Sequence, residues 1–282
     1  MELFVHSFVF NNKKENSYLL WNRAGECLLV DPGCSTPYEQ ELLTGFLSRN
    51  NLYPKRLLLT HGHFDHVAGV PFLIQEYGCE CWMHSAEEKE LQLSRTLAPM
   101  YEFETVEEFQ VDHHYDDSTQ LSFGGICLRV IHIPGHTDGS VCLFVPGGPY
   151  LFAGDALVKG SLGFVNNSYG EVLAHLQKKI YPLPDETIIL YGHGPSSTLA
   201  EEKQTNPFFH RMNRKNNINK VDHSLFSARL IDFALPKPLC SATSSFDKPG
   251  CSAVRRRACA RRWPLTNCEK LTPISLLITR EI

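Results

Sequence analysis

The sequence has no apolar run long enough to mark a membrane span. Its apolar stretches all fall short of the ~20 residues that a helix needs to cross a bilayer. The N-terminal stretch MELFVHSFVFNNKK also lacks the basic segment and apolar core of a signal peptide. We therefore expect a cytoplasmic protein that makes no membrane contact. The 10 cysteines lack the spacing of a disulfide framework, so we interpret them as reduced thiols.

Two motifs of enzyme chemistry are missing as well. The sequence contains neither a Gly-x-Ser-x-Gly elbow nor a glycine-rich phosphate loop, which argues against a serine hydrolase of that type and against a P-loop nucleotide site. What remains is an ordinary globular composition, with 43% hydrophobic and 21% charged residues in 282. This predicts one large domain, or a domain with an appendage, that buries a sizeable core.

The charge is divided unevenly along the chain. Residues 211–282 hold 14 Lys and Arg against 5 Asp and Glu, which leaves 13 against 26 in residues 1–210. The acidic body argues against a nucleic-acid grip by that part of the chain. We predict a domain over residues 1–212 and a basic, Cys/Arg/Pro-rich tail over residues 213–282. We interpret the tail as disordered or loosely attached rather than as a nucleic-acid patch.

The most informative stretch is residues 60–66, which read THGHFDH. It follows the apolar run Leu57-Leu58-Leu59, which reads as a buried strand, so the motif lies on the loop that leaves the strand's carboxyl end. His61, His63 and His66 offer imidazole nitrogens and Asp65 offers oxygen, the donors that zinc or iron accepts. A packed core does not gather three imidazoles and a carboxylate without a ligand to hold them. This pattern therefore indicates a metal site.

Strands that end in a polar loop recur along the chain. We expect strands over residues 3–10, 18–21, 27–30, 57–59, 80–83, 126–133, 141–145, 150–152 and 187–190. We expect helices over residues 36–50, 67–77 and 169–180 and from Ser85 onward, with a loop or short insertion over 100–117. His113 and His114 in that insertion, like His84 and His175, are interpreted as solvated. Two halves of strands with helices outside predict an α/β, four-layered αβ/βα sandwich with its site at one shared edge.

At this point the sequence resembles a known family. Thr-His-x-His-x-Asp-His is similar to the signature of the metallo-β-lactamase superfamily. Residues 134–140 (PGHTDGS), 152–155 (FAGD), 191–195 (YGHGP) and 201–208 (EEKQTNPF) resemble its glyoxalase II-like (hydroxyacylglutathione hydrolase-like) branch. The resemblance covers residues 1 to about 210 and implies a metallo-β-lactamase-like sandwich.

The resemblance also implies a set of metal ligands. One ion would be held by His61, His63 and His136, a second by Asp65, His66 and His193, and Asp155 would bridge the two. The expected cofactor is a pair of Zn²⁺ ions, with Fe or Mn left open. An aspartate at the position of Asp31 lies beside the metals in the family; a plain turn residue is an equally good interpretation of the local sequence.

The implied activity is hydrolysis of a small acyl-thioester such as S-lactoylglutathione. A hydroxide bridging the two ions would attack the carbonyl carbon, with Asp65 and Asp155 as the catalytic carboxylates. Family members that bind glutathione carry Lys or Arg just beyond the second glycine after the bridging aspartate, where this chain has Phe164. This departure argues against glutathione as the thiol carrier. We expect a small-molecule substrate as the partner, and the oligomeric state is left open. Three alternatives remain: a mononuclear iron persulfide dioxygenase, a lactonase or phosphodiesterase on the same scaffold, and a non-catalytic metal-binding protein.

Overall fold

The computed structural model describes residues 2–103, 106–166 and 168–213. The predicted tail, with its cysteine and arginine clusters, lies outside the described residues except for Asn213. No helix in the described part of the chain is long and apolar enough to span a bilayer.

The first half of the described chain builds a six-stranded sheet, ordered β1-β2-β3-β4-β5-β6. Its strands are β1 (Leu3–Phe10), β2 (Glu15–Asn22), β3 (Glu26–Val30), β4 (Tyr53–Leu58), β5 (Glu80–His84) and β6 (His113–Tyr115). Strands β1 to β3 pair antiparallel, whereas β3 to β6 run parallel. Because parallel neighbours need crossover connections, helices follow β3, β4 and β5. These are α1 (Pro37–Arg49), α2 (Phe64–Val67), α3 (Val70–Tyr77), the 3-10 helix η1 (Ser85–Glu87), α4 (Glu88–Leu97) and the 3-10 helix η2 (Ala98–Tyr101).

The second half builds a second six-stranded sheet, ordered β14-β13-β10-β9-β8-β7. Its strands are β7 (Gln120–Phe123), β8 (Ile126–His132), β9 (Val141–Phe144), β10 (Tyr150–Gly154), β13 (Ile188–Tyr191) and β14 (Ser197–Thr198). A small hairpin of β11 (Leu157–Val158) and β12 (Ser161–Leu162) follows β10. The helices of this half are α5 (Tyr169–Lys179), α6 (Leu199–Thr205) and α7 (Pro207–Asn213).

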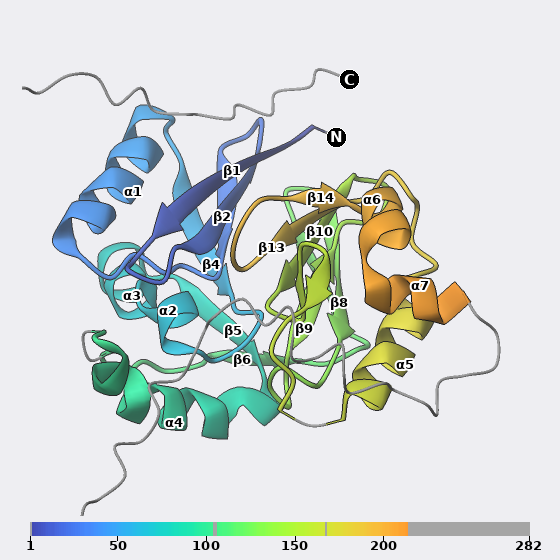
Figure 1. The fold of residues 1–282 in the computed structure, drawn as a ribbon. Helices are drawn as coiled ribbons and strands as arrows, with labels where there is room; N and C mark the ends of the chain where they lie inside the picture. Colours follow the sequence, from blue (N-terminus) through green and yellow to red (C-terminus); the bar gives the residue numbers. More distant parts are fainter. Residues whose placement is uncertain (1, 104–105, 167, 214–282) are drawn as a thin grey trace, which may run out of the picture. The chain divides into compact units, whose positions relative to one another are not determined.

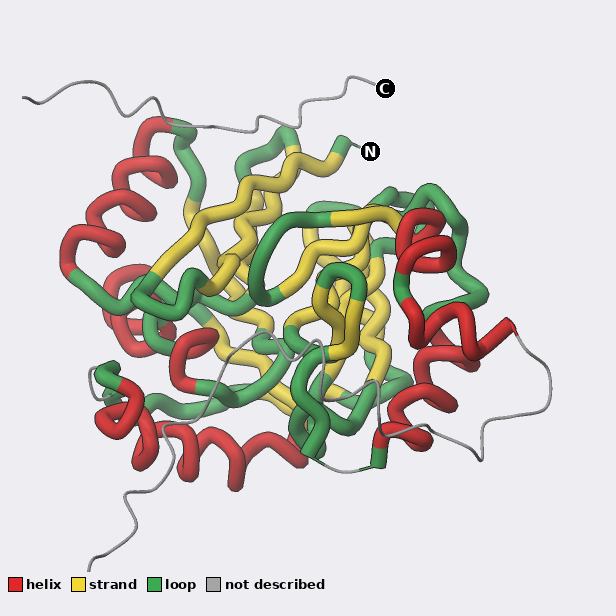
Figure 2. Tube along the Cα trace, in the orientation of Figure 1, coloured by secondary structure: helices red, strands yellow, loops and turns green. Residues whose placement is uncertain are grey.

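The two sheets lie between two outer layers of helices. Helices α1 to α4 cover one flank and α5 to α7 the other (Figures 1 and 2). Successive side chains of a strand point to opposite faces. Leu57 therefore packs toward Leu47 of α1, while Leu58 joins Leu143 in the cluster between the sheets. A third buried cluster, around Leu176 of α5, lies on the outer face of the second sheet. The predicted four-layered αβ/βα sandwich is confirmed.

Local sequence signals explain several element ends. Thr36 caps α1 in a full capping box, in which the Glu39 amide donates to the Thr36 hydroxyl and the Glu39 carboxylate accepts from the Thr36 amide. Helix α3 stops at Gly78, whose φ of 65° suits a residue without a Cβ atom.

Three expectations need correction. The helix expected over residues 67–77 begins only at Val70, and Val67 ends a separate short helix, α2, that starts at Phe64 within the motif expected to be a loop. The Gly69 amide between them donates to the Pro32 carbonyl, which anchors the break. Residues 113–115 form strand β6, not a loop, by pairing parallel to β5. Strand β7, the two-residue strands β11, β12 and β14, and helices α6 and α7 were not expected at all.

Candidate metal centre

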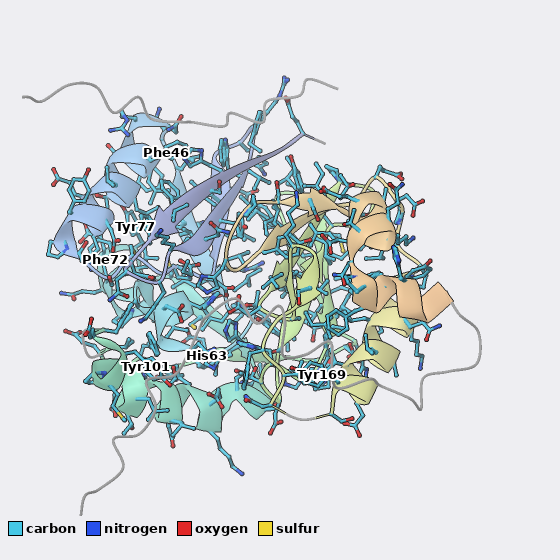
Figure 3. The ribbon with its side chains drawn as sticks, viewed as in Figure 1. Phe46, His63, Phe72, Tyr77, Tyr101 and Tyr169 are labelled. Atoms are coloured by element: carbon cyan, nitrogen blue, oxygen red, sulfur yellow. The ribbon has the colours of Figure 1, made fainter. Side chains whose placement is uncertain are left out.

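The seven side chains singled out by the sequence come together at one edge of the sandwich. Four of them lie on the loop and helix that follow β4, and the other three follow β8, β10 and β13. Figure 3 labels His63, which lies where the two halves meet. The strands thus deliver all seven from their carboxyl ends, where open α/β sheets place their ligand sites.

His61, His63 and His136 form the first set. The Nδ1 atom of His63 lies 3.1 Å from Nε2 of His61 and 3.0 Å from Nε2 of His136. Tetrahedral zinc bound at ~2.0–2.1 Å would hold such nitrogens about 3.3–3.4 Å apart. Three imidazole nitrogens thus converge on one point at nearly the spacing of a zinc shell.

Asp65, His66 and His193 form the second set. The Nε2 atom of His193 lies 3.2 Å from Nε2 of His66 and 3.4 Å from Oδ2 of Asp65. All three offer one ligand atom within 4.8 Å of the others. The set contains two nitrogens and one oxygen. Because His66 is fully buried, the protein covers the set from that side.

Asp155 links the two sets. Its Oδ2 atom lies 3.7 Å from Nε2 of His136, 3.7 Å from Nε2 of His66 and 3.5 Å from Nε2 of His193. Its Oδ1 atom is buried and has no hydrogen-bond partner among the described residues. A buried carboxylate oxygen without a partner is costly unless something else occupies it.

Asp31 lies behind both sets rather than in a free turn. Its carboxylate accepts hydrogen bonds from the Thr60 amide (2.7 Å) and hydroxyl (2.6 Å), and its Oδ2 atom lies 3.2 Å from Nδ1 of His66. Asp31 is also close enough to His61 and His66 to complete a third possible ligand group. Because its oxygens are already engaged by Thr60, we interpret Asp31 as holding His66 in place and not as a ligand.

The rings of the two sets differ in protonation state. Burial lowers the pKa of His61 well below its usual value and that of His136 to about 4, so both are neutral at pH 7. The pKa of Asp155 is well below its usual value: burial opposes this, but the neighbouring His193 and His66 outweigh it. Burial likewise opposes the change at Asp65, but the neighbouring His66 and His193 lower the pKa of that carboxyl below its usual value. Burial opposes a rise in the pKa of His66 and of His193, but Asp155 and Asp65 raise both, so these two rings lose a proton when they bind a cation.

Two buried carboxylates near the centre were not singled out from the sequence. Glu87 accepts hydrogen bonds from the Gly62 amide (2.7 Å) and the Gly139 amide (2.6 Å), and so joins the loop after β4 to the loop after β8. Glu15 accepts from the Ser17 hydroxyl (2.8 Å) and lies 4.0 Å from Nδ1 of His66. Burial raises the pKa of both. The only sequence signal for Glu87 was an acidic first helical turn, which ordinarily means a favourable helix dipole.

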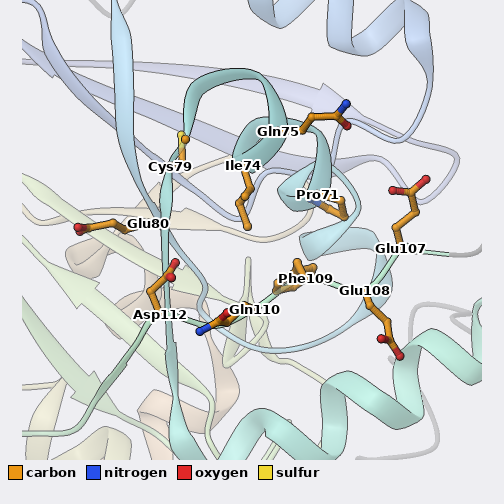
Figure 4. A pocket seen from close by; sticks show the side chains of 11 residues that line it. Pro71, Ile74, Gln75, Cys79, Glu80, Glu107, Glu108, Phe109, Gln110 and Asp112 are labelled. Carbon is orange, nitrogen blue, oxygen red and sulfur yellow. The ribbon is translucent and has the colours of Figure 1, made fainter.

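The other histidines and the cavity shown in Figure 4 lie apart from this centre. None of His84, His113, His114 and His175 belongs to a group of described residues close enough to share an ion. His84 stacks instead on the ring of His132, with centroids 4.2 Å apart. The cavity, of about 430 Å³, is lined by α3 and the segment before β6, and none of the seven side chains borders it (Figure 4).

Comparison with known proteins identifies relatives of this chain. Residues 12–193 match the family model described as the metallo-beta-lactamase superfamily. The chain is 32% identical over 202 residues to hydroxyacylglutathione hydrolase GloC of Haemophilus influenzae, spanning 69% of this chain and 92% of that protein.

Two solved structures are similar in fold and sequence. That of the B3 metallo-beta-lactamase BLEG-1 has a TM-score of 0.66 at 30% identity and covers 73% of this chain and 99% of its own. That of TTHA1623 in a di-iron-bound form has a TM-score of 0.64 at 32% identity and covers 72% and 98%. The chain therefore belongs to the metallo-β-lactamase superfamily of metal-dependent hydrolases and resembles its glyoxalase II-like branch.

Proposed function

We propose that this protein hydrolyses a small acyl-thioester with two divalent metal ions, zinc being the best fit. One ion would be held by His61, His63 and His136, and the other by Asp65, His66 and His193. The observation that carries the proposal is the position of Asp155, whose one oxygen lies within 3.7 Å of ring nitrogens from both sets. A single ion would leave one of the two sets unused.

The residues present fit such a pair of ions. The donors are imidazole and carboxylate without thiolate, which suits a catalytic zinc with an open position better than a closed structural one. The free Oδ1 of Asp155 and the convergence of three nitrogens on one point support the fit. Two ions ~3.5–4 Å apart carry more charge than imidazoles alone compensate, and Asp65 and Asp155 supply the balance.

The chain's own groups then bind and orient the reactants. When bound, the two ions supply Lewis acidity for the substrate carbonyl and activate water at neutral pH. Asp65 stays ionised in the folded protein. Its carboxylate can therefore accept a hydrogen bond from the attacking water and orient it. Its main-chain carbonyl is fixed by the Asn11 side chain at 2.9 Å, which holds the start of α2 in place. No side-chain nucleophile is required.

The thioester assignment rests on the similarity to hydroxyacylglutathione hydrolase over 92% of that protein's length. The rim of the centre favours a thioester other than one of glutathione. Phe164, whose carbonyl lies 2.9 Å from Nδ1 of His136, has a 55% exposed side chain, and it offers no positive charge to a peptide carboxylate. We therefore propose a thioester with a less anionic thiol part.

A second candidate is hydrolysis of a β-lactam amide. It is supported by the 30% identity and 0.66 TM-score to the structure of the B3 metallo-beta-lactamase BLEG-1. The same two ions would serve an amide carbonyl as well as a thioester carbonyl.

A substrate panel on zinc-loaded protein tests both candidates. Acyl-thioesters of several thiols, a lactone and a chromogenic β-lactam would be compared by kcat/KM, with release of free thiol and uptake of oxygen followed in parallel. We expect free thiol without oxygen uptake. Oxygen consumption with a persulfide substrate, together with iron as the native metal, would contradict hydrolysis and favour the dioxygenase alternative.

We also propose that residues 1–212 form the whole catalytic unit. All seven ligands precede Pro195, and the last described helix, α7, ends at Asn213. A chain that ends at Asn213 should fold and keep both its metal content and its turnover. Loss of turnover with the metal retained would show that residues beyond Asn213 contribute substrate contacts.

A further inference from the structure

His63 differs from the other rings of the centre in the nitrogen that it turns inward. His61, His66, His136 and His193 each present Nε2 to the neighbouring donors, whereas His63 presents Nδ1. Its Nε2 atom therefore points outward. That atom lies 3.3 Å from Oε1 of Glu90, in the first turn of α4.

We propose that Glu90 is a positioning residue for the first metal ion. It accepts the Nε2–H of His63, which fixes the tautomer with its lone pair on Nδ1 and holds the ring toward His61 and His136. The inference rests on the proposed metal centre and adds to it a residue outside the ligand set. A carboxylate behind an imidazole ligand both orients the ring and increases its basicity.

His63 needs such a partner more than the other rings do. His61 and His66 are 1% and 0% exposed, whereas the side chain of His63 is 28% exposed. His61 is next to the Thr60 hydroxyl, and the Phe164 carbonyl fixes His136. The inner rings are held by groups in the core, but the outermost ring has only Glu90 within ion-pair distance in the described chain.

The backbone around Glu90 is itself held against the ligand loop. A Cβ atom on Gly62 would lie only 3.0 Å from the Leu91 amide nitrogen and 3.2 Å from Oε2 of Glu87, so the loop packs directly on the start of α4. Leu91 is buried in the core of the first half, which fixes the helix. Glu90 thus approaches His63 from a rigid element and not from a mobile side chain on a loop.

Glu90 should act on one ion only. The second set has its own carboxylate, Asp31, at Nδ1 of His66. Loss of a carboxylate behind a ligand typically weakens metal binding by 10–100-fold. We therefore expect the variant Glu90→Ala to weaken one of two zinc-binding events by about 10–100-fold and to leave the other unchanged. Glu90→Gln keeps a hydrogen-bond acceptor without the charge. Its zinc affinity at the weakened event should lie between those of Glu90→Ala and the wild type.

The test is a zinc titration of the full-length chain against a chromogenic chelator, which reads metal affinity without any substrate. Glu88→Gln is the matched control: Glu88 is the neighbouring acid on α4, is 61% exposed and contacts His114 instead. It should bind both ions as the wild type does. In a His63→Ala background, Glu90→Ala should have no further effect, because its target ring is gone.

The possible results separate the inference from the proposed function. Equal weakening of both binding events, or an effect of Glu90→Ala that persists without His63, would show a general structural role and overturn the inference. So would wild-type affinity in Glu90→Ala. A wild-type chain that binds no zinc would overturn the proposed metal centre as well. Two tight zinc-binding events in both the wild type and Glu90→Ala would leave the metal centre intact and overturn only the role of Glu90.

Discussion

The two halves of the sandwich contribute to the metal centre in different ways. The first half supplies four of the seven side chains within six residues, on the loop and short helix after β4. The second half supplies three, one from each of three separate loops, after β8, β10 and β13. One half offers a contiguous motif, and the other offers single residues brought together only by folding.

The difference lies in what holds each ligand. Asp65 and His66 share one helical turn, since α2 runs from Phe64 to Val67, and Asn11 and Asp31 support that turn from behind. The second-half ligands are fixed from outside their loops. His193 pairs through its backbone with Glu15, and the Asn166 side chain donates to the His136 carbonyl at 2.7 Å. The second half therefore depends on contacts between distant parts of the chain.

The largest effect should come from removing Asp155, the one second-half ligand that lies close to both sets. Asp155→Ala should lose most of the metal from both sites, because its Oδ2 atom is close to rings of each. Removing a residue that supports a ligand weakens metal binding by about 10–100-fold. Removing a ligand itself should cost more, so we expect metal binding to be more than about 100-fold weaker. Elemental analysis after dialysis measures this. A full complement of metal in the variant would show that the centre lies elsewhere.

A second large effect should follow from cutting the link between the halves. Glu87→Ala would leave the buried Gly62 and Gly139 amides without their acceptor. At about 1–3 kcal/mol for each of these two unsatisfied groups, the free energy of unfolding of the metal-free protein should fall by roughly 2–6 kcal/mol. Urea unfolding measures it, with Glu88→Ala as the exposed control. An equal, small change in both variants would mean that the two loops do not rely on this carboxylate.

The same contrast explains what the sequence revealed. The residues of the first-half motif could be predicted because they are adjacent, and most strands of four or more residues because their apolar runs are long enough to detect. Strands β11, β12 and β14, with two residues each, are too short to show a period. Glu87 and Glu90 looked like ordinary acids of a first helical turn, since their targets, Gly62, Gly139 and His63, are distant in sequence or in another element. Family resemblance, not local pattern, singled out His136, Asp155 and His193.

A substitution of Asp31 should affect only one of the two metal sites. Asp31→Asn keeps a residue that tolerates its positive φ of 47° but removes the charge behind His66. We expect one zinc-binding event to weaken by about 10–100-fold. It should be the event that Glu90→Ala leaves unchanged, so the two variants together should weaken both. If both substitutions weaken the same event, the division of ligands into two sets is wrong.

The smallest effect should come from a second-half contact that touches no ligand. Asp117 accepts hydrogen bonds from Nζ of Lys179 in α5 (2.6 Å) and from the His132 amide (2.7 Å) at the end of β8. Burial raises the pKa of Asp117, but these two donors together outweigh it and hold the pKa below the usual range. A carboxyl group with a depressed folded pKa stabilises the protein above its unfolded pKa of about 3.9, and this stabilisation is lost as the pH falls through the folded value.

Asp117→Asn should therefore be less stable than the wild type at pH 7, and the deficit should disappear as the pH falls below about 4. Because the carboxylate is 52% exposed, solvent screening limits the deficit to less than about 1 kcal/mol. Urea unfolding of both proteins across this pH range measures the difference, and the metal content should be unchanged at pH 7. A deficit that is equally large at pH 3 and pH 7 would mean that the shape of the side chain, and not its charge, ties α5 to the end of β8.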